Sequence, residues 1–99
     1  MISLKPQAGL GPNFVSKTAR LEQLGAIQFA VVGLTAGQVT FQYSVDGGAN
    51  WFALDATNLV FSEDGTRVAS WGGCEVRAIG DGAIAGGNLD VLINGPYVV

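Results

Sequence analysis

Short runs of alternating apolar and polar residues, separated by glycine-rich turns, recur from Ala26 to the end of the chain. The clearest run covers residues 39–45 and gives one face the apolar side chains Val39, Phe41, Tyr43 and Val45. Its other face carries Thr40, Gln42 and Ser44, which we expect to be the wetter side. Roughly seven or eight such runs, with turns about every 8–12 residues, predict an all-β fold. We expect a single-domain antiparallel β-sandwich or jelly roll.

The N-terminal residues 1–13 differ from the rest because they contain two prolines and two glycines. These residues disfavour regular structure, so we predict an extended N-terminal arm, followed by a β-sandwich domain over 14–99. The arm also carries residues suited to bind a partner, which are Ile2, Leu4, Lys5 and Leu10. We expect the arm to leave the domain and lie on another chain. The alternative is a terminal tail without a partner.

Residues 14–24 fit either a strand or a short helix that ends at Gly25. The alternation favours a strand with one wet face. Its other, more apolar face carries Val15, Lys17, Ala19 and Leu21.

The charge content is low: 13% of the residues are charged and 48% are hydrophobic. Ordinary soluble proteins have about 25% charged residues. A small domain with so little charge is often part of an interface that covers its surface, which favours a homo-oligomer within a larger assembly. The alternative is a monomer coated with neutral polar residues.

The few charges are unevenly placed. Residues 1–24 carry three basic and one acidic side chain, whereas residues 25–99 carry two basic and seven acidic ones. The acidic domain is poorly suited to bind phosphate backbones, so we expect no nucleic-acid partner. We also expect no membrane partner, because no apolar stretch approaches the length of a membrane span. The N-terminus does not resemble a signal peptide, which predicts synthesis in a cytoplasm.

Catalytic and metal-binding chemistry finds little support in the composition. The chain has no histidine and one cysteine, Cys74, which excludes an intrachain disulfide, a histidine-based nucleophile and a Cys/His metal site. The carboxylates fall in turns or on wet strand faces, which is typical of a solvated surface. We therefore expect no enzyme activity and no cofactor, and we interpret Cys74 as a small buried hydrophobe.

One local motif is sharp. Ser44, Asp46, Gly48 and Trp51 have the spacing S-x-D-x-G-x-x-W, which resembles the Asp box of sialidase propellers and other β-proteins. We expect the Asp46 carboxylate to accept backbone N–H bonds across a turn, and Trp51 to pack over the hairpin. The resemblance implies a structural turn and not an activity. The alternative is a Ca²⁺ or ligand contact at Asp46.

The wider frame of residues 36–94 resembles small β-sandwich proteins encoded among phage structural genes. The resemblance rests on the strand and Asp-box run 39–51, on Glu75-Val76-Arg77-Ala78, and on a final glycine-rich turn into 88–93. It implies a virion protein that decorates, staples or cements a capsid, with the major capsid protein or a tail protein as its partner. A tail, baseplate or fibre subunit is the nearest alternative.

A carbohydrate-binding module is the alternative from another class. It requires at least two aromatic side chains exposed on one face, drawn from Tyr43, Trp51, Trp71 and Tyr97. Two tryptophans in a small β-domain more often belong to the core or to hairpin packing.

Overall fold

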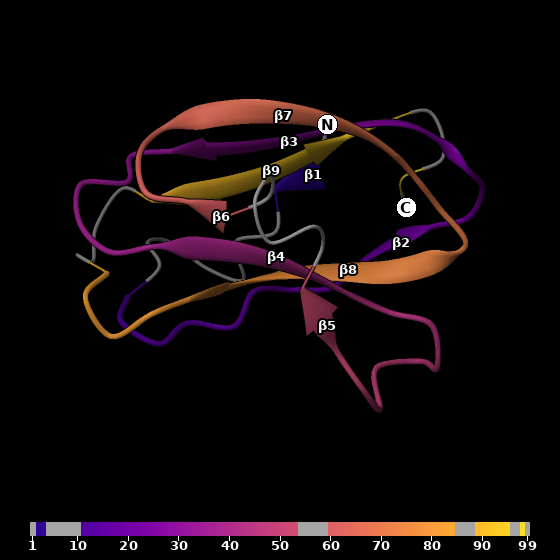
Figure 1. The fold of residues 1–99 in the computed structure, drawn as a ribbon, viewed down its shortest axis with the longest axis horizontal. Coiled ribbons are helices and arrows are strands. Elements are labelled where there is room, and N and C mark those ends of the chain that lie inside the picture. Colours follow the sequence, from indigo (N-terminus) through magenta and orange to yellow (C-terminus); the bar gives the residue numbers. More distant parts are fainter. Residues whose placement is uncertain (1, 4–10, 54–59, 85–88, 96–97, 99) are drawn as a thin grey trace.

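The computed structural model describes residues 2–3, 11–53, 60–84, 89–95 and 98. Within these residues the chain is all β, and two antiparallel sheets lie face to face as a β-sandwich (Figure 1). The predicted fold class is therefore confirmed.

The first sheet has four strands, in the spatial order β1 (Ile2–Ser3), β9 (Asp90–Asn94), β3 (Gly25–Val32) and β7 (Gly65–Trp71). The second sheet has the order β2 (Ala19–Leu21), β8 (Cys74–Gly80), β4 (Val39–Ser44) and β5 (Phe52–Ala53). A short strand, β6 (Val60–Phe61), also pairs with β4.

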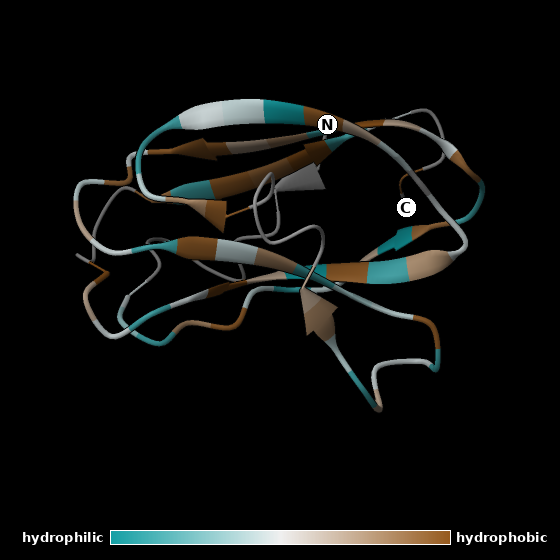
Figure 2. Ribbon diagram, in the orientation of Figure 1, coloured by the Kyte–Doolittle hydropathy of each residue, from teal (hydrophilic) through white to brown (hydrophobic). Residues whose placement is uncertain are grey.

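The core lies between the two sheets and is built from alternate residues of each strand. Phe29 of β3 meets Phe41 of β4 with ring centroids 5.0 Å apart, and Phe41 meets Phe61 at 5.8 Å, both edge to face. These three rings link the sheets, because Phe29 belongs to the first and the other two to the second. Figure 2 shows β3 and β9 as largely hydrophobic strands, whereas β2 and β8 carry hydrophilic segments.

The predicted register of residues 39–45 holds at the start of the strand and fails at its end. Val39 and Phe41 are fully buried, and Tyr43 is half-buried against the core. However, Val45 is 70% exposed, while Ser44 is only 1% exposed. The strand ends at Ser44, and the turn that follows covers the Ser44 hydroxyl with hydrogen bonds, so the alternation does not extend to Val45.

The segment 14–24 forms a strand only over β2, and the predicted face is wrong in its first half. Phe14 and Ser16 are buried, whereas Val15 and Lys17 are exposed. The Ser16 hydroxyl accepts a hydrogen bond from the Ala78 backbone N–H (2.8 Å) and donates one to the Lys17 carbonyl (2.7 Å). A buried serine with its polar group satisfied this way counts as an inward residue, which the apolar pattern alone does not reveal.

The prediction that the arm leaves the domain is wrong for the part that the structure describes. Ile2 and Ser3 pair with Ile93 and Leu92 of β9 in the same chain, and the Asn13 backbone N–H donates to the Asp81 carbonyl (3.0 Å). An extended segment satisfies its backbone groups at the edge of its own sheet without the entropy cost of association. Three of the proposed arm contacts, Leu4, Lys5 and Leu10, lie outside the described residues.

Candidate functional site

The motif residues Ser44, Asp46, Gly48 and Trp51 come together in the turn that follows β4. The Ser44 hydroxyl donates to the Asp46 carboxylate (2.6 Å) and accepts from the Gly48 backbone N–H (2.9 Å). The Asp46 carboxylate also accepts from the Asn50 backbone N–H (3.0 Å) and from the Asn50 side-chain amide (2.7 Å). Gly48 has a φ of 95°, a value that suits glycine, and its carbonyl accepts from the Trp51 indole N–H (3.1 Å). Both carboxylate oxygens of Asp46 thus serve the turn.

These hydrogen bonds have an electrostatic consequence. The Ser44 hydroxyl, and then the Asn50 side chain and backbone, stabilise the charged carboxylate and lower the pKa of Asp46 from 3.8 to about 2. Because the folded pKa lies below the unfolded one, the stabilisation is present above about pH 4 and is lost as the pH falls towards 2.

We therefore expect acid to lower the melting temperature of the wild type more steeply than that of Asp46→Asn between about pH 4 and pH 2. Asparagine keeps one oxygen that can accept from the Ser44 hydroxyl and the Asn50 backbone N–H, loses the acceptor for the Asn50 side chain at every pH, and does not titrate there. Melting curves followed by circular dichroism at closely spaced pH values measure the difference, and the remaining carboxylates act alike in both proteins. Parallel pH profiles would contradict this account of the turn.

Trp51 is held on the outer face of the five-stranded sheet. The Arg77 guanidinium lies over its ring at 4.2 Å from the centroid, and the Arg77 Nε–H donates to the Gln42 side-chain oxygen (3.0 Å). Tyr43 lies on the opposite, inner face, because it pairs with the fully buried Val76. Tyr43 and Trp51 therefore do not form one stacking platform. The Trp71 side chain and Tyr97 lie outside the part of the chain that the structure describes.

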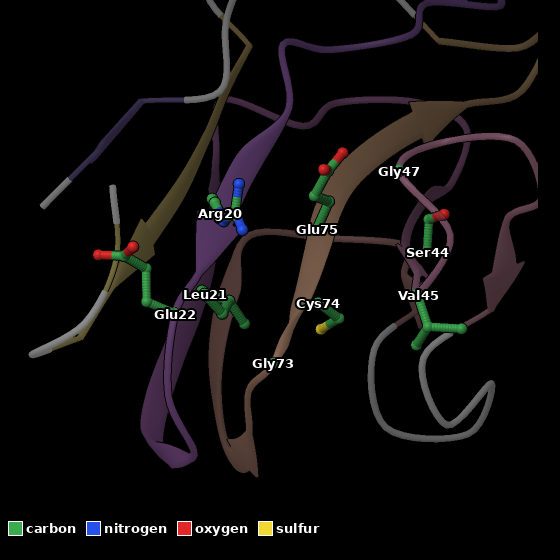
Figure 3. A pocket seen from close by; sticks show the side chains of 9 residues that line it. All are labelled: Arg20, Leu21, Glu22, Ser44, Val45, Gly47, Gly73, Cys74 and Glu75. Atoms are coloured by element: carbon green, nitrogen blue, oxygen red, sulfur yellow. The ribbon is translucent and has the colours of Figure 1, made fainter.

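An open depression of about 410 Å³ lies beside this turn. Figure 3 shows the residues around it, which come from the end of β2, the start of β8 and the turn after β4: Arg20, Leu21, Glu22, Ser44, Val45, Gly47, Gly73, Cys74 and Glu75. Arg20 and Glu75 are direct cross-strand neighbours. Cys74 is buried, as the sequence predicts, and the chain has no histidine to activate its thiol. The depression is therefore lined by one basic and two acidic side chains beside a buried thiol.

The outer face of the four-stranded sheet is almost free of charge. Ile27, Phe29 and Val31 are buried in the core, so the alternate residues of β3 and their cross-strand partners face outward. The described side chains on this face are Ala26, Gln28, Ala30, Val32, Thr66, Val68, Ser70, Asp90, Leu92 and Asn94. Of these, only Asp90 is charged. By contrast, the outer face of the other sheet carries Arg20, Glu75 and Arg77.

Apolar side chains are exposed to solvent on this nearly uncharged face. Val32 on β3 is 50% exposed and Val68 on β7 is 67% exposed, and Leu92 on β9, the other neighbour of β3, is half-buried. We call the outward residues of β3, β7 and β9 the neutral face.

Comparisons with known proteins return nothing. No protein-family model, no curated protein and no solved structure matches this chain. Among the described residues, no group of three or more Cys, Asp or Glu side chains is placed to hold a metal ion. No helix long and apolar enough to cross a membrane is found in that same part of the chain.

Two contributors to the turn were missed by the sequence analysis. Asn50 binds both oxygens of Asp46, and Arg77 covers the ring of Trp51. Asn50 lies inside the motif at a position that the pattern leaves free, so it carries no signal of its own. Arg77 lies far along the chain, and only the pairing of Gln42 with Arg77 brings it beneath the turn.

Proposed function

We propose that this protein is a non-enzymatic structural subunit that attaches to a larger protein lattice through its neutral face. Its proposed class is that of virion accessory proteins, with a capsid decoration or cement protein as the first case to test. The observation that carries the proposal is the exposure of Val32 and Val68 on a sheet face where Asp90 is the single charge described.

The physical support is the match between this face and the centre of a protein interface. Charged residues are depleted at the core of interfaces, because a buried charge without a partner costs more free energy than a neutral side chain. The neutral face has that composition, and its three strands are joined side by side by backbone hydrogen bonds. The opposite outer face is less suited, since the turn over Ser44 and the charges of Arg20, Glu75 and Arg77 interrupt it.

Such a subunit works by repetition. Each copy contributes one small contact to the lattice, and copies that bridge neighbouring subunits gain affinity through effective concentration. The partner that this predicts is a repeated protein surface, such as a major capsid protein or a tail protein. Nucleic acid and membranes are not partners in this proposal.

The test uses capsid shells and tails purified from phage particles of the source that encodes the chain. We expect the wild type to co-sediment with the shells and to saturate at a fixed number of copies per shell subunit. Negative-stain imaging should then show added density on the shell surface. Val32→Glu is expected to weaken this binding about tenfold or more, because it places a carboxylate beside Asp90 within the contact.

The matched control is Val45→Glu, which makes the same change at a valine that is 70% exposed, against 50% for Val32, near the other sheet. It should bind as the wild type does. A wild-type protein that binds neither shells nor tails would overturn the proposed class, and tail binding alone would make the protein a tail, baseplate or fibre subunit. If Val32→Glu binds normally, the neutral face is not the contact.

A further inference from the structure

The edges of the two sheets are unequal. Three of the outer strands, β1, β5 and β6, have two residues each, and β2 has three. By contrast, β7 is an edge strand of seven residues, and within the described residues it pairs only with β3. An edge strand leaves every second set of backbone N–H and C=O groups without a ladder partner, so a long edge is a template for another strand.

Of the usual protections of an edge, β7 has a single charge, Arg67, and neither a bulge nor a proline. Its register with β3 is continuous over seven pairs, from Gly25 with Trp71 to Val31 with Gly65, so no bulge interrupts it, and it contains no proline. Its single charge, Arg67, lies opposite the buried Phe29, and its guanidinium sits over the Phe61 ring at 5.3 Å from the centroid. The outward side chains Thr66, Val68 and Ser70 are exposed and neutral.

We propose that β7 pairs antiparallel with β7 of a second copy of this chain, around a two-fold axis at Val68. The run Thr66-Arg67-Val68-Ala69-Ser70 is self-complementary in that register. Val68 faces Val68 of the second copy, and Thr66 faces its Ser70, so a β-branched apolar pair is flanked by hydroxyl pairs. Arg67 faces Ala69 of the second copy, so the two like charges are diagonal neighbours and not directly opposite each other.

This register explains why the occupant is a second copy. In a two-fold contact residue i meets residue j and j meets i, so only a residue on the axis meets its own copy, and a charge at that position would face an equal charge. Here the centre is the exposed valine, and the charge is displaced to the inner side. Pairing joins two four-stranded sheets into one of eight strands and makes the two neutral faces continuous. The pairing itself does not depend on the proposed lattice.

The first test measures the mass of the isolated protein by sedimentation equilibrium over a range of concentrations. We expect the wild type to be a dimer, and Val68→Glu to associate at least tenfold more weakly, because two carboxylates then face each other at the axis. The controls Val32→Glu and Val45→Glu should remain dimers, with melting curves showing that all variants fold. A monomeric wild type, or a Val68→Glu variant that associates normally, would overturn the pairing.

The second test fixes the register. Facing Cα atoms in an antiparallel pair lie about 4.5 or 5.5 Å apart, which is within the range that a disulfide spans. Val68→Cys is therefore expected to form a covalent dimer under mild oxidation, whereas Val32→Cys stays monomeric on a non-reducing gel. The natural Cys74 is buried, and the wild type serves as its control. Cross-linking at position 32 and not at 68 would place the contact on the neutral face instead of the edge.

These tests separate the two proposals. They use the isolated protein, so a failure of the pairing leaves the lattice contact to be tested by co-sedimentation, and the reverse also holds.

Discussion

Replacing Phe41 with alanine is expected to lower the free energy of unfolding by about 3–5 kcal/mol. Phe41 is fully buried, and its ring contacts Phe29 in the facing sheet and Phe61 in its own. The substitution removes the apolar transfer energy of the ring and leaves a cavity between two sheets that strand pairing holds apart. Since small domains have about 5–15 kcal/mol of stability, this one change removes a large share of it.

The matched control is Phe52→Ala, because the Phe52 side chain is 53% exposed at the edge of the same sheet. It should cost about 1 kcal/mol or less, since the ring contacts Tyr43 alone among the ring pairs described (centroids 5.8 Å apart). Urea unfolding curves measure both values. Similar losses for the two variants would show that the Phe29–Phe41–Phe61 cluster is not the centre of the core.

Gly72→Ala is expected to lower the free energy of unfolding by about 3 kcal/mol, the upper end of the range for overpacked sites. A Cβ at this position would collide with the carbonyl of Gln23 and the backbone nitrogen of Leu24. That segment cannot move aside easily. It is held on one side by the pairing of Leu21 with Cys74 and on the other by the pairing of Gly25 with Trp71.

The control for this prediction is Gly11→Ala, where a Cβ would meet nothing within 4 Å and φ is not in the left-handed region. That variant should be neutral or slightly stabilising, because alanine restricts the unfolded chain more than glycine does. Thermal and urea unfolding of the two variants side by side gives the comparison. If Gly72→Ala is tolerated as well as Gly11→Ala, Gly72 does not lie against the backbone of Gln23 and Leu24.

The two outer faces of the sandwich divide the protein's proposed work. One face is occupied by its own chain, since the turn of Ser44, Asp46, Gly48 and Trp51 covers part of it. The other face has no described segment over Val32 and Val68 and almost no charge. Among the described residues, the face with almost no charge is therefore the one that we propose as the contact with a partner.

Much of the fold was determined by the sequence alone. The period-two alternation and the glycine-rich turns predicted an all-β sandwich, because an apolar face that recurs every second residue is buried by packing two sheets together. The spacing of Ser44, Asp46, Gly48 and Trp51 likewise predicted the turn, since all of its hydrogen bonds are local and fall within eight residues.

Other features were decided only by the tertiary structure, and each depends on contacts between distant residues. Ser44 is buried and Val45 exposed because a turn folds back over the strand end, and Ser16 is buried because Ala78 offers it a hydrogen bond. Ile2 and Ser3 join the domain's own sheet because β9 has a free edge there. Which strand is left as a long edge, and which outer face is left neutral, follows from the order of the strands in space. Local periodicity determines which side chains are apolar, but strand order determines which of them remain uncovered.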